Sequence, residues 1–188
     1  LDRQIGDGDH GENMDRGFSA VIRGDGLETA QSSTDVLKYV AKTLMSTVGG
    51  AAGPLYGTAF LRAAGQFSDG ELSSAEIADL LEAAVGGVQA RGKAVAGEKT
   101  MVDVLLPAAA EARLCADQGL DVTTTWRRVA DVGAQAAEDT IPLKATKGRA
   151  SYLGDRSIGH KDPGATSTAL VLEAAALAAE QVYGSNGE

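Results

Sequence analysis

The acidic residues near the start of the chain stand in an unusual glycine-rich setting. Asp7 and Asp9 alternate with glycines in the string GDGDHG, and Asp2 lies shortly before them. Glycine allows tight backbone turns, so we expect the three carboxylates to converge. Converging carboxylates repel one another unless a cation lies between them, and oxygen ligands favour Mg²⁺ or Ca²⁺.

An EF-hand calcium loop does not fit this string. A loop that begins at Asp7 would place Glu12 at its glycine position and Phe18 at its bidentate glutamate position. Magnesium fits better, because it is held by few carboxylates and completes its shell with substrate phosphates. A glycine-aspartate turn that caps the next helix explains the string equally well.

Three further glycine-rich segments have the composition of anion-binding loops, at 49–54, 91–100 and 147–166. Backbone N–H groups of Ala51 and Ala52 can cradle an anion, and Pro54 is expected to begin the next helix. The segment is not a Walker A loop, because it lacks Gly-Lys-Ser/Thr. Helix starts of the same kind are predicted at Asp162, Pro163 and Gly164, where a plain cap is an equal alternative.

Histidines, basic residues and a methionine that could pack against a flat ring lie in the same glycine-rich segments. The only two histidines, His10 and His160, both lie there, and His10 is expected to donate to a phosphate or ribose rather than to bind metal. Met101 is either core or an apolar platform for a flat ring. Eight of the 17 basic residues fall within 91–99 and 144–161, which suggests a bound anion; the alternative is solvated loop charges. They are Arg91, Lys93, Lys99, Lys144, Lys147, Arg149, Arg156 and Lys161.

The elements that position these residues are all predicted to be helices. Apolar residues repeat at the spacing of a helical face, and Ser73 with Glu76 predicts a capping box. About seven helices are expected, at 12–23, 36–48, 54–67, 73–88, 101–116, 125–138 and 165–182. Short connections make successive helices antiparallel, so every second loop lies at the same end. The four glycine-rich loops should therefore meet at one rim, with the polar linkers 24–32, 68–73 and 117–121 at the other.

Composition limits the classes of protein. The 188 residues fit one domain, 1–188, and the net charge of −9 makes nucleic acid an unfavourable partner. No apolar run reaches the roughly 18 residues of a membrane span, and no secretory signal is recognisable. The single cysteine, Cys115, reads as a core residue, so a cytoplasmic location is expected. The chain opens beside its main motif at Leu1, and we expect an N-terminal helix to precede this numbering.

Four strings taken together resemble the L subunit of the bacterial dihydroxyacetone kinases over nearly the whole chain. They are LDRQIGDGDHGENMDRGF, VGGAAGPLYGTAF, GEKTMVDVLLP and KGRASYLGDRSIGHKDPGATS. The related ATP-dependent kinases carry Thr after the GDGD string, so His10 and the following Asn13-Met14 favour the form linked to the phosphotransferase system. Two positions depart from the family: Ala52 stands where Ser is usual, and Glu98 where Asp is usual.

The resemblance implies an all-α fold, an antiparallel up-and-down helical barrel of about seven to eight helices with the nucleotide at one rim. It implies that Asp2, Asp7 and Asp9 hold two Mg²⁺ ions and, with Arg149, act in catalysis. Nucleotide contacts are implied for His10, Asn13, Ala51, Ala52, Gly92, Met101, Arg149, Asp162, Pro163 and Gly164.

The resemblance also implies partners. ADP stays bound, a phosphohistidine protein of the phosphotransferase system converts it to ATP, and ATP then phosphorylates dihydroxyacetone on a separate K subunit. A homodimer is left open. Two alternatives remain: a nucleotide-binding domain of an ATP-dependent kinase for a small ketose or sugar, and an ADP-dependent regulatory module without catalysis. Exchange of bound ADP with ATP would favour the first alternative, and ADP-dependent binding without phosphotransfer the second.

Overall fold

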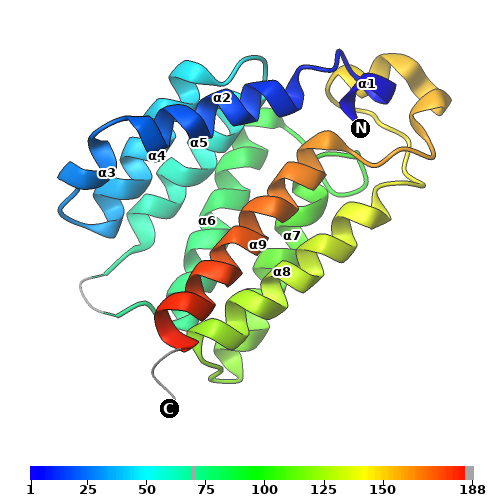
Figure 1. The fold of residues 1–188 in the computed structure, drawn as a ribbon. Coiled ribbons are helices and arrows are strands. Elements are labelled where there is room, and N and C mark those ends of the chain that lie inside the picture. Colours follow the sequence, from blue (N-terminus) through cyan, green and yellow to red (C-terminus); the bar gives the residue numbers. More distant parts are fainter. Residues whose placement is uncertain (69–70, 185–188) are drawn as a thin grey trace.

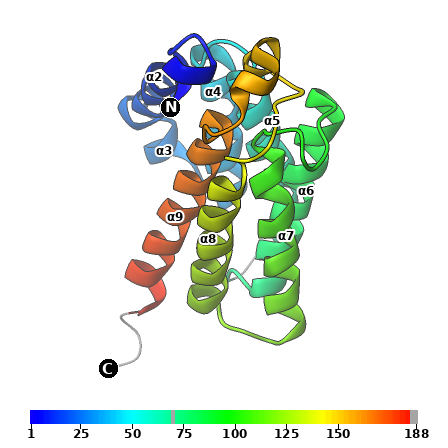
Figure 2. The same ribbon diagram turned by 90° about the vertical axis from the view of Figure 1, so that its right-hand side faces the viewer.

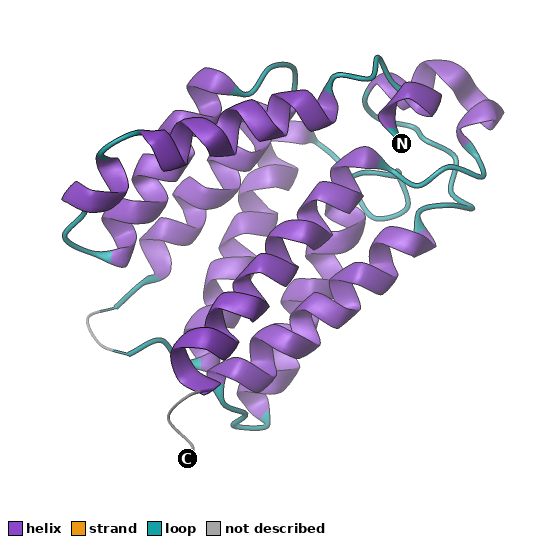
Figure 3. Cartoon of the chain, viewed as in Figure 1, coloured by secondary structure: helices purple, strands orange, loops and turns teal. Residues whose placement is uncertain are grey.

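The computed structural model describes residues 1–68 and 71–184, and within these ranges the chain forms helices and no strands (Figure 3). The all-α prediction is therefore confirmed. Seven helices are long (Figure 1): α2 (His10–Arg23), α4 (Ser33–Thr47), α5 (Ala52–Ala63), α6 (Ser74–Gly92), α7 (Val102–Asp117), α8 (Val122–Asp139) and α9 (Pro163–Tyr183).

The structure adds four short helical elements that the periodicity did not predict. They are α1 (Asp2–Ile5), α3 (Gly26–Thr29) and the 3-10 helices η1 (Ala64–Gln66) and η2 (Arg149–Ser157). The segment 147–166 is thus not all loop as expected, because η2 fills half of it. Elements this short bury too few residues to show a helical period in the sequence. Residues 69–70 of the linker predicted at 68–73 lie outside the described residues.

Local capping explains where two of the long helices begin. The predicted capping box at α6 is present: Ser73 Oγ accepts from Glu76 N at 3.2 Å, and Glu76 Oε2 accepts from Ser73 N at 3.0 Å. The α9 helix begins as predicted, with Asp162 as cap and Pro163 at its first position. Helix α5 instead starts at Ala52, two residues before the predicted Pro54.

Each of the helices α4 to α8 packs closely against the next one in the chain, in an up-and-down order. Figures 1 and 2 show this sequential order, with α1 and η2 side by side at one end of the molecule. Helices α2 and α9 make only a few contacts, so the ring of helices closes loosely between them. The short connections account for this arrangement, because a helix that follows a short loop packs antiparallel to the helix before it.

Small residues in the core let the helices approach closely. Helix α7 contributes Val104, Ala108 and Ala112, each fully buried. Where α2 crosses α4, a side chain at Gly17 would place its Cβ 2.2 Å from Val48 Cγ2, so only glycine fits. This crossing fixes α2 and hence the residues at its start. Cys115 is also fully buried, as predicted. Within the described residues, no helix is both long and apolar enough to cross a membrane.

Candidate functional site

A pocket of about 430 Å³ lies at the end of the molecule where α1 and η2 meet. Its volume is within the range of about 300–1,000 Å³ that is typical of small-molecule sites. All four glycine-rich loops contribute to its lining, which confirms that they converge on one rim. The first loop contributes residues 5–7, 9 and 10, and the second contributes 49–52. The third contributes 91, 92, 94 and 99–102, and the fourth contributes 147–150 and 162–164.

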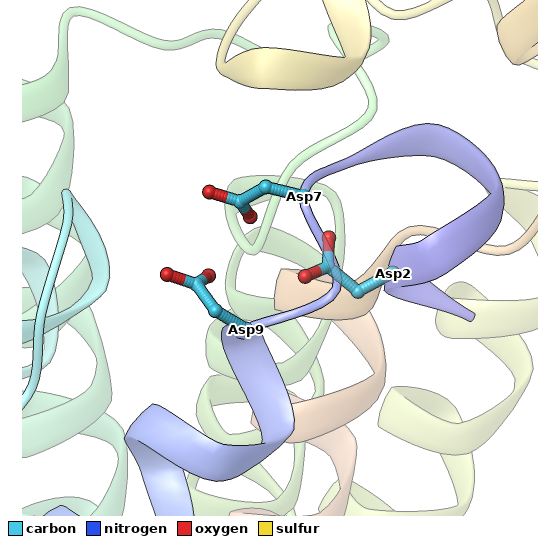
Figure 4. A group of neighbouring side chains, drawn as sticks. All are labelled: Asp2, Asp7 and Asp9. Atoms are coloured by element: carbon cyan, nitrogen blue, oxygen red, sulfur yellow. The ribbon is translucent and has the colours of Figure 1, made fainter.

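Three carboxylates meet at the edge of this pocket. Asp2, Asp7 and Asp9 each offer one oxygen, and these oxygens lie within 4.8 Å of one another. Figure 4 shows the three side chains facing a common space. Asp9 is the residue that precedes α2, yet its side chain makes no capping hydrogen bond. The alternative that these aspartates serve only as helix caps therefore does not describe Asp9.

The backbone around the cluster is fixed by close contacts. The backbone N–H of His10 donates to Asp2 Oδ2 at 3.0 Å, which ties α1 to the start of α2. A Cβ at Gly6 would lie 1.9 Å from Asp2 Oδ1, so a side chain there would collide with the carboxylate. Gly8 has φ +82°, a backbone conformation that other residues rarely adopt. Gly6 and Gly8 are thus needed where the carboxylates converge.

Arg149 reaches the cluster from the far end of the chain. Its Nη1 forms an ion pair with Asp7 Oδ2. The guanidinium is placed by η2, which packs on α1 through a small apolar cluster of Ile5, Ala145 and Ala150. The pocket edge therefore combines three negative charges with one positive charge that pairs with Asp7.

His10, the first residue of α2, joins the cluster to the helices beneath it. Its Nε2 lies 2.8 Å from Ser167 Oγ on α9, and Ser167 Oγ lies 2.6 Å from the hydroxyl of Tyr56 on α5. Burial lowers the pKa of His10, although the neighbouring aspartates act in the opposite direction. Burial also raises the pKa of Tyr56 to about 12. Both side chains are therefore neutral at pH 8.

The expected group of eight cations is only partly present in the pocket. Arg91, Lys99, Lys147 and Arg149 line it, whereas the other four do not. Lys99 is a correction, because its buried Nζ donates to three backbone carbonyls instead of facing an anion. These are the carbonyls of Thr140 at 2.8 Å, Ile141 at 3.2 Å and Leu143 at 3.0 Å.

Two of the four cations outside the pocket have carboxylate partners. Lys161 pairs with Glu138, and Lys144 pairs with Asp155 at 2.7 Å. His160 is also absent from the lining, so the structure does not place it with His10. The sequence of a loop indicates that its basic residue lies near the pocket end of the molecule, but packing decides the direction in which the side chain points.

The remaining predicted residues all line the pocket. Asn13 is buried, and its Oδ1 accepts from the guanidinium of Arg16. Met101 is buried as well, and it lies close to Gly164. Asp162 caps α9 by accepting from Ala165 N at 2.7 Å, and burial raises its pKa to about 6. The others are Ala51, Ala52, Gly92, Pro163 and Gly164.

Sequence reasoning missed two hydroxyl side chains of the site, Tyr56 and Ser167. Tyr56 lines the pocket, and Ser167 binds both it and His10. The sequence carried a weak signal for each, because both are polar residues on the inner side of otherwise apolar helices just after a glycine-rich loop. Their pairing across two helices could not be read from spacing.

Comparison with known proteins shows which protein family the sequence matches. The DAK2 domain matches residues 4–177. The chain is 44% identical to the ADP-binding subunit DhaL of the PEP-dependent dihydroxyacetone kinase of Escherichia coli strain K12, over 96% of this chain and 87% of that protein. It is 46% identical to the corresponding subunit of kinase 1 of Listeria innocua, over 93% of this chain and 82% of that protein.

A solved structure has the same fold. The dihydroxyacetone kinase from C. freundii, in complex with AMP-PNP and Mg²⁺, superposes on 94% of this chain with a TM-score of 0.64 and 23% sequence identity. The chain spans 29% of that kinase. The likeness shows that the all-helical arrangement occurs in a kinase, and at this identity it shows the fold alone.

Proposed function

The chain belongs to the DAK2 domain family, and we propose that it is the ADP-binding phosphoryl-transfer subunit of a dihydroxyacetone kinase. The observation that carries the proposal is the cluster of Asp2, Asp7 and Asp9, which shares one pocket with the ion-paired Arg149. The relatives that are 44% and 46% identical are named as ADP-binding subunits of such kinases.

The chemistry of the donor set fits magnesium. Three carboxylates supply only hard oxygen ligands, and too few of them to complete an octahedral shell, as expected for an ion that also binds substrate phosphates. We propose that these residues hold two Mg²⁺ ions. When bound, the ions supply charge neutralisation for the transferred phosphoryl group.

Other residues of the chain bind and orient the nucleotide in this proposal. The N–H groups of Ala51 and Ala52 lie at the start of the 12-residue helix α5, and an anion is favoured there by the helix dipole. No acceptor among the described residues binds these two N–H groups. Arg149 adds a charge-assisted contact. Ala52 offers no hydroxyl, so backbone donors act alone at that position.

The remaining lining residues hold the rest of the nucleotide. Met101 is buried and apolar, which suits the flat face of a base. His10 and Asn13 offer polar atoms beside the carboxylates, whereas the small Gly92 lets the backbone approach a ligand closely. The segment from Asp162 to Gly164 lines the same pocket at the start of α9.

The proposed reaction needs two partners. A phosphohistidine protein of the phosphotransferase system transfers its phosphoryl group to bound ADP, and the ATP formed passes it to dihydroxyacetone on the K subunit. Because the hydroxyl that accepts the phosphoryl group belongs to the substrate on the other subunit, this chain positions the nucleotide and neutralises charge. We expect no phosphorylation of dihydroxyacetone by this chain with ATP alone.

Native mass spectrometry of the purified chain tests the proposal first. One ADP and two Mg²⁺ should remain bound, and a phosphohistidine donor should convert that ADP to ATP in place. A protein that releases ADP and exchanges it rapidly with ATP would instead act as an ATP-dependent kinase. Binding of ADP without phosphotransfer in the complete system would indicate a regulatory module and overturn the proposal.

A further inference from the structure

Tyr56 is a buried tyrosine to which the proposed function gives no role. Its side chain is only 3% exposed, and it lines the pocket from α5. Its hydroxyl lies near three oxygens of α9: Ser167 Oγ at 2.6 Å, Thr168 Oγ1 at 2.9 Å and the Gly164 carbonyl at 3.3 Å. A buried hydroxyl with one proton can donate to only one of them.

Ser167 lies between Tyr56 and the carboxylate cluster. Its Oγ is 2.6 Å from the Tyr56 hydroxyl, 2.8 Å from His10 Nε2 and 3.1 Å from the Gly164 carbonyl. The backbone N–H of His10 in turn donates to Asp2 Oδ2. Hydrogen bonds therefore link the buried tyrosine on α5 to the His10 ring through Ser167, and the backbone of the same histidine binds the first carboxylate of the cluster.

The contacts of Ser167 with Tyr56 and His10 allow either atom to be the donor, so we assign the protons in this path by distance. Thr168 Oγ1 donates to the Gly164 carbonyl at 2.8 Å, so that carbonyl already has a partner. The shortest contact of the Tyr56 hydroxyl is to Ser167, and we assign its proton there. The Ser167 proton is then directed to His10 Nε2, which is closer than the Gly164 carbonyl. A neutral imidazole that accepts at Nε2 carries its proton on Nδ1.

We propose that Tyr56 and Ser167 are positioning residues that hold the His10 ring in its Nδ1–H form, so that it donates a hydrogen bond to the phosphates of the nucleotide. The part that concerns phosphates rests on the proposed function, whereas the ring form does not. The opposite ring form would present a lone pair at Nδ1, which repels an anion. Among the described residues no side chain or backbone group binds Nδ1.

The ring form can be measured without any ligand. In the ¹⁵N-labelled chain at pH 8.5, above the ordinary pKa of histidine, long-range ¹H–¹⁵N spectra distinguish a protonated from a bare ring nitrogen. The chain has two histidines, so His160→Gln assigns the signals. We expect His10 to show a protonated Nδ1 and a bare Nε2. A protonated Nε2 in the wild-type chain would overturn the proposal.

Variants then test the path itself. Ser167→Ala should move His10 toward the Nε2–H form and weaken ADP binding about tenfold, the size of one hydrogen bond to a charged group. Tyr56→Phe should shift the ring form partially, and Ser167→Thr should restore both properties because it keeps the hydroxyl. Tyr39→Phe is the matched control, since Tyr39 donates to the Val21 carbonyl, away from His10. It should leave the His10 signals unchanged.

The outcomes separate this proposal from the proposed function. A wild-type chain with the Nδ1–H form but no ADP binding would contradict the function and keep the assignment of the ring form. Tight ADP binding that Ser167→Ala leaves unchanged, together with an unchanged ring form, would refute the positioning role. If Ser167→Ala does not fold, the wild-type spectrum and the Tyr56→Phe variant still decide.

Discussion

Arg149 forms an ion pair with Asp7, which joins the fourth and the first glycine-rich segments of the chain around one cluster of carboxylates. The Arg149 side chain is 63% exposed and that of Asp7 31% exposed, so the pair lies at the pocket edge. Without a bound cation, the guanidinium is the positive charge that the cluster receives from the chain itself. Arg149 therefore competes with a cation for Asp7 but supports the binding of an anion.

Replacing Arg149 should change the binding of metal and nucleotide in opposite directions. In Arg149→Gln, Mg²⁺ alone should bind up to about fivefold more tightly, because a competing exposed charge is lost. ADP with Mg²⁺ should bind about tenfold more weakly, because a charge-assisted contact is lost. Isothermal titration calorimetry measures both. Arg156→Gln, an exposed residue of the same helix η2, should change neither. Weaker binding of Mg²⁺ alone in Arg149→Gln would contradict the competition.

Removing one carboxylate should stabilise the metal-free chain and remove its response to metal. In Asp9→Asn, the repulsion among the three carboxylates falls, so Tm without metal should rise slightly. The rise in Tm that Mg²⁺ causes in the wild-type chain should be largely lost. Differential scanning calorimetry with and without Mg²⁺ checks both effects. Asp15→Asn, an exposed change on the same helix, should keep the wild-type response. A full response in Asp9→Asn would exclude Asp9 as a ligand.

Lys99 should matter for stability more than its place in a loop suggests. Its buried ammonium donates to three carbonyls just beyond the end of α8, and burial lowers its pKa. Lys99→Met removes three hydrogen bonds and leaves the Leu143 carbonyl without a partner, whereas the Thr140 and Ile141 carbonyls still accept from Leu143 N at 3.1 Å and Gly159 N at 2.8 Å. The unfolding free energy should therefore fall by at least about 2 kcal/mol. Lys144→Met removes only an exposed pair with Asp155 and should cost under about 1 kcal/mol. Equal losses in urea titrations would show that the carbonyl contacts add nothing.

Because of Asp162, the free energy of unfolding should decrease as the pH rises from about 4 to about 6. Burial raises the pKa of the folded chain's carboxyl to about 6 from an unfolded value of 3.8. The folded state therefore binds more protons than the unfolded state between these values, and stability falls as pH rises from about 4 to about 6. The full effect is about 3 kcal/mol.

The variant Asp162→Asn isolates this effect. Asparagine caps a helix as well as aspartate does and carries no titrating group. The difference in unfolding free energy between wild-type and variant should therefore change across pH 4–6 and stay constant above pH 7. Urea titrations at a series of pH values measure it. A difference that stays the same across the whole range would show that the carboxyl of Asp162 keeps an ordinary pKa.

The sequence predicted the helices and the end of the molecule at which the site lies. Apolar spacing fixed seven long helices to within a few residues, because one face of each must be buried. Alternation of glycine-rich and polar connections placed the loops, since short connections force antiparallel neighbours. The cluster of Asp2, Asp7 and Asp9 was also predictable, because eight residues with two glycines can bring carboxylates together without help from distant parts of the chain.

Other features depended on how the helices are rotated against one another. Lys99 was expected to face an anion, but packing turns it toward the carbonyls after α8. The contacts between Tyr56, Ser167 and His10 join three helices, so no local spacing reveals them. Local sequence thus determined which elements form and which chemical groups reach the rim. Only the tertiary structure decided which of those groups meet, because side-chain direction is set by the packing of whole helices.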